Sequence, residues 1–457
     1  MPNKFSRRAA LKNLSLTMAG LSFTPSAWAK TEDGIPILLP DSKRKKPLAK
    51  PVTAITLGAG NRGNVYGNYA TKYPDELNIV GVAEPIEIRN KRYQSQHDIA
   101  DDHVFDTWEK VFMVPKFADA IIITTPDDLH YGPCMQALKM GYDVLLEKPI
   151  SPSEQECRDI LELSEQTGRI VAVCHVLRYA PYFIKLREII QSGVLGKVVS
   201  MQHFEPIEAI HMAHSFVRGN WHNSIETAPI ILAKSCHDLD IMKWMLEKNC
   251  RQIHAFGSLS WFNKENDPKG STSRCMDGCA IESSCPYSAM KIYYRDRQRT
   301  YVFDLPEDKS QHGEAILEYL RTTNYGRCVY KMENDQPDHY TCNMLFEDEV
   351  TATFNMEAFT SYHGRRTRIM GSLGDIVGDM QRFEYTDFLT GEKTVWEQQT
   401  DGHGGGDWNL VSDWIQAVAN QDQSLLTSTI AASIESHIMG FAAEDSRKEG
   451  RVVAVEV

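Results

Sequence analysis

Three glycines near the start of the chain have the spacing that binds a dinucleotide. An apolar run over 55–57 leads into Gly58-Ala59-Gly60-Asn61-Arg62-Gly63, a G-x-G-x-x-G pattern between a predicted strand and a predicted helix. Gly58 permits a tight turn, Gly60 lets the backbone approach a pyrophosphate, and Gly63 lets the helix pack closely on the strand. The amides at the helix start then face the phosphates. We therefore expect the cofactor to contact Gly58, Gly60, Asn61, Arg62 and Gly63.

An acidic residue follows at the distance that this motif requires. A second apolar run, 79–83, ends at Glu84, about twenty residues after Gly63. A carboxylate there accepts hydrogen bonds from the adenosine ribose hydroxyls and repels a 2′-phosphate. The sequence thus predicts NAD as the cofactor, with NADP less favoured.

The elements around this motif predict a two-domain protein. Strand and helix patterns alternate from 52 to about 173, which is typical of an N-terminal Rossmann domain (51–175) with a doubly wound parallel sheet. Alternating segments such as 350–356 predict that the remainder (176–457) is an α+β domain with a large, mostly antiparallel open sheet. Two helical patterns, at about 408–420 and 430–449, close this second domain. The fold class is therefore α/β followed by α+β.

Several polar residues follow directly after predicted strands. Ligands of such sheets lie beyond the carboxyl ends of the strands. Thr125, His130, Glu147, Lys148 and His175 all fall at that edge. We expect the chemistry there.

The first 29 residues have the features of an export signal. Ser6-Arg7-Arg8 is a twin-arginine signature, an apolar run covers 14–23, and Ala27-Trp28-Ala29 offers a cleavage site. A basic amphipathic tail is the alternative. We predict export by the twin-arginine machinery to the periplasm or beyond, followed by a polar linker at 30–50.

Charge excludes several classes of partner. The formal net charge is −12, and removing a signal with four basic and no acidic residues makes it −16. So acidic a surface argues against nucleic acid and anionic membranes as partners. No apolar run after residue 29 is long enough to span a bilayer, and no cysteine near the cleavage site indicates a lipid anchor.

Four of the ten cysteines suggest a metal site. Cys275, Cys279 and Cys285 form C-x3-C-x5-C-P, and Cys328 follows alone. Four thiolates can hold a structural zinc ion tetrahedrally. Disulfides, an iron–sulfur cluster and free thiols are the alternatives. Three further cysteines lie in helix or strand patterns and are predicted to be buried: Cys134, Cys157 and Cys174.

Five motifs together resemble those of the Gfo/Idh/MocA family, which includes glucose–fructose oxidoreductase and inositol 2-dehydrogenase. The resemblance covers essentially the whole chain after the linker. It implies an NAD(P)-dependent dehydrogenase that acts on a sugar, cyclitol or related polyol. The motifs are the glycine turn, Thr125-Pro126-Asp127-Asp128-Leu129-His130, Glu147-Lys148-Pro149, His175-Val176-Leu177-Arg178-Tyr179 and Cys236-His237-Asp238-Leu239-Asp240.

The resemblance assigns two catalytic residues. Lys148 matches the family's catalytic lysine, whose charge can stabilise an alkoxide as hydride leaves. His237 matches the catalytic histidine, which can take the hydroxyl proton. Many members carry an aspartate four residues earlier, where this chain has Ala233 followed by Lys234. The usual arrangement is thus incomplete, and Lys234 is a candidate for an electrostatic or substrate-binding role.

The remaining site residues follow from the same analogy. Cofactor contacts are expected from Thr125, Pro126, His130, Glu147 and Arg178, in addition to Lys148. Substrate contacts are expected from Tyr179, Lys234, His237 and His403. Purely structural roles stay open for His130, Arg178 and Tyr179, and helix capping stays open for Asp407.

These inferences predict an exported dehydrogenase that holds NAD tightly, because no free nicotinamide pool exists outside the cytoplasm. The resemblance also favours a homo-oligomer. One alternative is an NAD-dependent glycosidase or lyase that oxidises its sugar transiently and then eliminates the aglycone. A non-catalytic sugar-binding protein is the second alternative.

Overall fold

The computed structural model describes residues 28–30, 36–38, 48–398 and 403–456. The predicted signal peptide up to residue 27 and most of the predicted linker lie outside the described residues. Two short strands, β1 (Trp28–Lys30) and β2 (Pro36–Leu38), pair antiparallel.

The first domain contains the predicted parallel sheet. Its six strands lie in the order β5-β4-β3-β6-β7-β8, all parallel. The central strands are apolar and buried along their length, since helices cover both faces of a parallel sheet. The strands are β3 (Val52–Leu57), β4 (Leu77–Ala83), β5 (Val104–Phe105), β6 (Ala120–Ile123), β7 (Asp143–Leu146) and β8 (Val171–Val173); the helices are α2 (Asn61–Lys72), α3 (Glu87–His97), α4 (Trp108–Val111), α5 (Tyr131–Lys139) and α6 (Glu154–Thr167).

The second domain contains a nine-stranded, mostly antiparallel sheet, as predicted. Its order is β16-β15-β14-β13-β9-β12-β11-β10-β17, and only β9 and β12 run parallel. Burial alternates along strands such as β11, so one face packs on the core. The strands are β9 (Val198–Pro206), β10 (Cys250–Ser258), β11 (His339–Phe346), β12 (Thr351–Glu357), β13 (Arg366–Gly371), β14 (Gly374–Gly378), β15 (Arg382–Asp387), β16 (Lys393–Glu397) and β17 (Val453–Ala454).

In the part of the chain that the structure describes, seven α-helices follow β8. Among the described residues, none of the helices has the length and apolar character needed to cross a membrane. They are α7 (Pro181–Gln191), α8 (Ala209–His211), α9 (Ile230–Ala233), α10 (Cys236–Leu246), α11 (His312–Thr322), α12 (Gly406–Asn420) and α13 (Ile430–Glu449).

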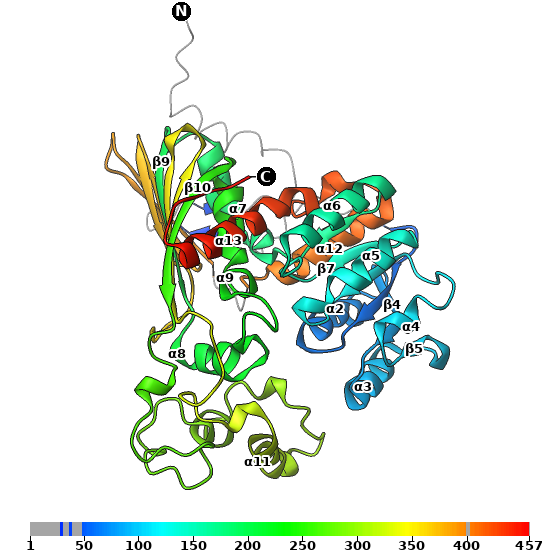
Figure 1. Ribbon diagram of the computed structural model, residues 1–457. Helices are drawn as coiled ribbons and strands as arrows, with labels where there is room; N and C mark the ends of the chain where they lie inside the picture. Colours follow the sequence, from blue (N-terminus) through cyan, green and yellow to red (C-terminus); the bar gives the residue numbers. More distant parts are fainter. Residues whose placement is uncertain (1–27, 31–35, 39–47, 399–402, 457) are drawn as a thin grey trace, which may run out of the picture.

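The two closing helices form where predicted, but they do not belong to the second domain alone. Leu410, Trp414 and Ile415 of α12 are fully buried in the core that the first domain builds around β3. Helix α13 joins both domains: Ile434 packs on the first domain, and Met439 packs in the core of the second. Figure 1 shows both helices, in orange and red, against the blue and cyan N-terminal domain. Helix α12 therefore completes the core of the first domain although it follows the predicted boundary at residue 175, because its apolar face packs on the parallel sheet.

A lobe forms between β10 and β11. It contains the cysteine-rich segment. Residues 259–338 have a small core of their own, which includes Tyr293, Phe303, Ile316 and Leu320. Figure 1 shows this lobe, with α11, below the open sheet and close to α3.

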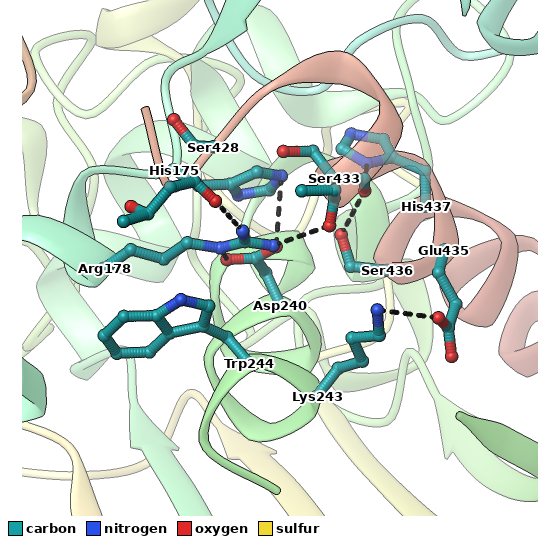
Figure 2. Close-up of polar contacts among 12 residues, drawn as sticks. His175, Arg178, Asp240, Lys243, Trp244, Ser428, Ser433, Glu435, Ser436 and His437 are labelled. Carbon is teal, nitrogen blue, oxygen red and sulfur yellow. Dashed lines mark hydrogen bonds and ion pairs between the residues drawn. The ribbon is translucent and has the colours of Figure 1, made fainter. Parts of the chain in front are cut away.

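A buried ion pair locks the two domains together (Figure 2). Arg178 follows β8, and its Nε and Nη2 donate to the two carboxylate oxygens of Asp240 on α10, at 2.8 and 2.6 Å. The same guanidinium donates to the carbonyl oxygens of Thr427 and Ala432. Both charged groups are almost completely buried. Every nitrogen of Arg178 is thus engaged inside the protein, which supports the structural role left open for this residue and argues against the predicted cofactor contact.

The substitution Arg178→Lys should destabilise the protein by about 3 kcal/mol, because a lysine cannot span both oxygens and leaves Asp240 partly unpaired in a buried site. Urea unfolding measures this loss. The same change at Arg158, whose pair with Glu154 is exposed, should cost less than about 0.5 kcal/mol. Equal effects at both positions would contradict the assignment.

Candidate active site

The glycine turn has the geometry that a dinucleotide needs. Gly58 has a φ of +92°, and a Cβ there would lie 2.6 Å from the Thr124 carbonyl oxygen. A Cβ on Gly63 would lie 2.2 Å from the Gly58 carbonyl oxygen, so helix and turn are in direct contact. A Cβ on Gly60 would meet nothing within 4 Å. Open space therefore lies over Gly60, where the helix α2 begins and its first amides are available to a pyrophosphate.

Glu84 lies directly after β4 and is buried. One carboxylate oxygen accepts from the amide of Ala59 at 2.8 Å, and the other accepts from the amide of Ile86 at 2.9 Å. Each oxygen keeps a second lone pair for a ribose hydroxyl. The residues of this edge thus fit an adenine dinucleotide.

The loop after β6 is held by His130. Its Nδ1 lies 2.7 Å from the Pro149 carbonyl oxygen, and its Nε2 lies 3.0 Å from the Thr125 carbonyl oxygen. Both ring nitrogens are therefore engaged within the protein. These bonds support the structural role left open for His130, because the ring holds the loop of Thr125 and Pro126 against the loop that carries Lys148.

A buried carboxylate, that of Glu147, organises the centre of the edge. It forms an ion pair with Arg62 and accepts from the Tyr66 hydroxyl at 2.7 Å, while its second oxygen accepts from the amide of Lys148 at 2.8 Å. Burial by itself would raise the pKa of Glu147, but the charges of Arg62 and Lys148 outweigh it and lower that pKa. Glu147 is thus ionised, and it holds the backbone of Lys148 in place. Arg62 also pairs with Asp407 of α12 at 2.6 Å. The glycine turn, Glu147 and the start of α12 therefore belong to one network of charges.

Lys148 and His237 come from different domains and meet at this edge. The Lys148 ammonium donates to the carbonyl oxygen of Ala233, the last residue of α9, at 2.8 Å. His237 lies one turn further along, on α10, with its Nδ1 buried and without a partner. Burial, followed by the charge of Lys148, lowers the pKa of His237 well below its ordinary value. The imidazole is therefore neutral at pH 7 and can accept a proton.

His403 extends the site toward solvent. Its ring centroid lies 5.6 Å from that of His237, and its Nδ1 lies 3.0 Å from an oxygen of Asp407. Burial raises the pKa of Asp407, but the hydrogen bond to His403 and the charge of Arg62 bring it below the ordinary value. Asp407 thus pairs with two side chains besides lying in the first turn of α12.

Lys234 is held by a carboxylate that sequence reasoning missed. Glu205, at the end of β9, pairs with Lys234 at 2.8 Å and with Arg365 at 3.1 Å. Arg365 then pairs with Asp238 at 2.5 Å, and Asp238 accepts from the ring of His203 at 3.0 Å. Only the lysine end of this chain of charges is appreciably exposed, which leaves Lys234 able to meet a substrate. No local pattern signals Glu205, because it lies in an alternating strand.

Tyr179 anchors the segment before α13. Its hydroxyl lies 3.0 Å from the Ser428 Oγ and accepts from the amides of Thr427 and Ser428. The side chain is buried, which supports the structural role left open for Tyr179 and argues against the predicted substrate contact. Asp127 was also missed: its buried carboxylate accepts from the indole of Trp221 in the second domain at 2.8 Å.

All ten cysteines are free thiols in the structure. The Sγ of Cys275 accepts from the amide of Ala289 at 3.4 Å and lies 3.8 Å from Arg218. Within the described residues, no three His, Cys, Asp or Glu side chains converge on a metal position. The predicted zinc site at Cys275, Cys279, Cys285 and Cys328 and the disulfide alternative therefore find no support. As predicted, Cys134, Cys157 and Cys174 are buried.

Comparison with known proteins accounts for this geometry. Residues 53–175 match the model of the GFO_IDH_MocA oxidoreductase family, an NAD-binding Rossmann fold. The match covers almost the whole of the first domain. The matched segment contains the glycine turn, Glu84 and Lys148, and ends at His175.

Relatives extend the likeness beyond that domain. The putative oxidoreductase YteT of Bacillus subtilis is 25% identical over 328 residues, which cover 67% of this chain and 74% of YteT. Matches to curated inositol 2-dehydrogenases span less than half of those proteins.

Solved structures share the whole fold. An inositol dehydrogenase homologue from Azotobacter vinelandii, complexed with NADH and myo-inositol, has a TM-score of 0.65 at 15% identity and covers 90% of this chain and 99% of its own. A levoglucosan dehydrogenase, complexed with NADH and levoglucosan, has a TM-score of 0.66 at 12% identity and covers 89% of this chain and 100% of its own. This chain therefore shares the two-domain fold of these proteins.

Two alanine substitutions in the glycine turn should affect different properties. Gly60→Ala should mainly change NADH binding, and Gly63→Ala should mainly change stability. Gly60→Ala should weaken NADH binding at least about tenfold while lowering stability by under about 1 kcal/mol, because the methyl group enters the space over the turn. Gly63→Ala should lower stability by about 1–3 kcal/mol through overpacking. Fluorescence titration with NADH and urea unfolding measure the two effects. Unchanged NADH affinity in Gly60→Ala would contradict the assigned nucleotide position.

Buried histidines should make the protein sensitive to acid. The Nε2 of His437 accepts from the amide of Ile150, just after the catalytic loop, at 2.9 Å, and burial lowers the pKa of His437 to about 3. The stability that this neutral ring contributes is complete above pH ~6.5, the unfolded value, and is lost as the pH falls toward 3.

Between pH 6.5 and 5, His437 alone should account for about 2 kcal/mol of lost unfolding free energy. His437→Gln keeps an acceptor for Ile150 and should flatten this part of the profile. His363→Gln, at an exposed position, is the control and should leave the profile unchanged. Identical profiles for the two variants would refute the role of His437.

Proposed function

We propose that the protein is an NAD-dependent dehydrogenase that oxidises a secondary hydroxyl of a sugar, glycoside or cyclitol, or reduces the matching carbonyl. One observation carries the proposal. A lysine ammonium after β7 and a neutral histidine on α10 meet beside a glycine turn with open space over it. Glu84 supports NAD over NADP, since its carboxylate would repel a 2′-phosphate.

Lys148 and His237 have different roles when a secondary hydroxyl loses its proton. Bound NAD⁺ would supply the hydride acceptor. The Lys148 ammonium, now on the Ala233 carbonyl, can turn one donor toward the substrate oxygen and stabilise negative charge there. His237 is uncharged and can take the hydroxyl proton. Glu147 holds the Lys148 backbone, so the ammonium reaches the substrate from a fixed base.

Lys234 supports recognition of a polar substrate. Its ammonium replaces the acid–base aspartate expected nearby and is fixed by Glu205. A fixed, partly exposed cation with a carboxylate beside it suits several hydroxyls of a polyol, which donate and accept at once. We therefore assign Lys234 to substrate binding and leave proton transfer to His237.

Export would shape how this enzyme uses its cofactor. We propose that the twin-arginine signature at Arg7 and Arg8 directs the folded protein out of the cytoplasm, with NAD already bound. Nucleotide would then be retained and recycled within turnover or by a second carbonyl substrate. Replacing both arginines with lysine tests the route, and undiminished export would refute it. A homo-oligomer stays a prediction for solution scattering.

The function is tested by turnover on a library of sugars, cyclitols and anhydrosugars that includes myo-inositol and levoglucosan, followed at the absorbance of reduced nicotinamide. Lys148→Met and His237→Asn should each lower kcat/KM by about 10²–10⁴ and leave NADH binding within about threefold. Lys139→Met changes an exposed lysine of the same domain and should have no effect.

Full activity in Lys148→Met would overturn the proposal. Release of nitrophenol from a nitrophenyl glycoside without net NADH would instead indicate oxidation and elimination. Binding of NAD and sugar with no turnover of any library member would indicate a sugar-binding protein.

A further inference from the structure

The lobe between β10 and β11 touches the first domain beside its nucleotide edge. Arg89, on α3, donates from Nε to Asp304 at 2.7 Å, and Arg92, one turn later, donates to the Leu305 carbonyl oxygen at 2.6 Å. The Arg89–Asp304 pair is partly buried. We call these two contacts the adenosine-side bridge, because α3 is the helix that follows Glu84.

Contacts within the lobe hold Asp304 in place for its ion pair with Arg89. Its amide donates to the Tyr319 hydroxyl at 2.9 Å, and that hydroxyl lies 3.4 Å from the Asp304 carboxylate. Phe303 stacks on Tyr319, with ring centroids 4.8 Å apart. Both aromatic rings pack in or against the small core of the lobe. The Asp304 carboxylate is therefore held in a fixed position, which lowers the entropic cost of forming its ion pair with Arg89.

A second bridge forms on the other side of the glycine turn. Trp221 donates from its indole to the buried carboxylate of Asp127, which follows β6. Trp221 packs on Phe216. The segment of Phe216 contacts the lobe through hydrogen bonds between His214 and Tyr293 and from Arg218 to the Arg327 carbonyl oxygen. In the sheet, β3 lies between β4 and β6. The two bridges thus stand on either side of the turn at Gly58–Gly63.

A dinucleotide on this fold lies across the carboxyl ends of these strands, from the ribose at Glu84 over the glycine turn. We propose that the lobe and the adjoining Trp221 segment form a clasp: the adenosine-side bridge and the Asp127–Trp221 bond close over bound NAD and set its rate of release. This inference rests on the NAD-dependent function proposed above. On this proposal, residues outside the glycine motif, in the two bridges, cause the protein to retain its cofactor.

The test is the rate at which NADH leaves the protein, followed by fluorescence after mixing with excess ADP-ribose. Arg89→Ala and Asp304→Asn should each speed release about threefold to tenfold. The double variant should release no faster than the faster single variant, because both changes break one pair. Raising salt should speed release in the unaltered protein and have less effect in these variants.

A charge swap and a matched control separate the clasp from general loosening. Arg89→Asp combined with Asp304→Arg should restore slow release. Glu314→Gln removes an exposed ion pair within α11 that does not touch the first domain, and it should leave release unchanged. Trp221→Phe should speed release through the second bridge. The nucleotide content of each purified variant after gel filtration gives an independent reading.

Release rates within twofold of the unaltered protein in both Arg89→Ala and Asp304→Asn, with folding intact, would overturn the clasp. Failure of the proposed function gives a different result. In that case the unaltered protein binds no NADH, or binds it without turnover, whereas failure of the clasp leaves binding and turnover in place.

Discussion

The site depends on one buried negative charge, the carboxylate of Glu147. A carboxylate removed from water is costly unless positive charge and hydrogen-bond donors surround it. Arg62, the Tyr66 hydroxyl and the Lys148 amide fulfil this requirement. In doing so they fix the glycine-turn helix and the lysine loop relative to each other. The lysine can therefore carry its charge to a substrate while its backbone stays still.

The same network reaches beyond the first domain. Asp407 opens α12 and pairs with Arg62 and His403, so the end of the chain contributes charge to the centre of the site. Helix α12 then completes the core of the parallel sheet. The Arg178–Asp240 pair holds α10, which carries His237, against the first domain. A site made of Lys148 and His237 thus exists only while the two domains stay docked.

Burial has a second consequence at this junction. The ring of His175 lies 6.0 Å from that of His237 and 5.4 Å from that of His437, measured between centroids. Burial lowers the pKa of all three histidines. Neutral imidazoles suit a base at the substrate and an acceptor for the Ile150 amide. The same neutrality makes the junction a weak point in acid, since unfolding lets each ring bind a proton. Burial of the histidines therefore accounts both for the neutral base that the proposed function needs and for the expected loss of stability in acid.

The sequence alone determined the features that are local. The glycine turn, the strand that precedes it, Glu84 and the position of Lys148 after β7 follow from apolar runs and short motifs, because strand periodicity and turn chemistry act over a few residues. The family resemblance added His237, and the alternating pattern predicted the open sheet. Helices α12 and α13 were also recognisable from their apolar spacing.

Only the tertiary structure decided what those residues touch. Arg62 and Asp407 are 345 positions apart, and no pattern in either segment specifies the other. Arg178, Tyr179 and His130 look like ligand contacts from their motifs, yet their polar atoms are used inside the protein. Glu205 and the Arg89–Asp304 contact had no local signal at all. Which charges are buried together depends on how the sheet, the closing helices and the lobe pack, and that packing is a property of the whole chain.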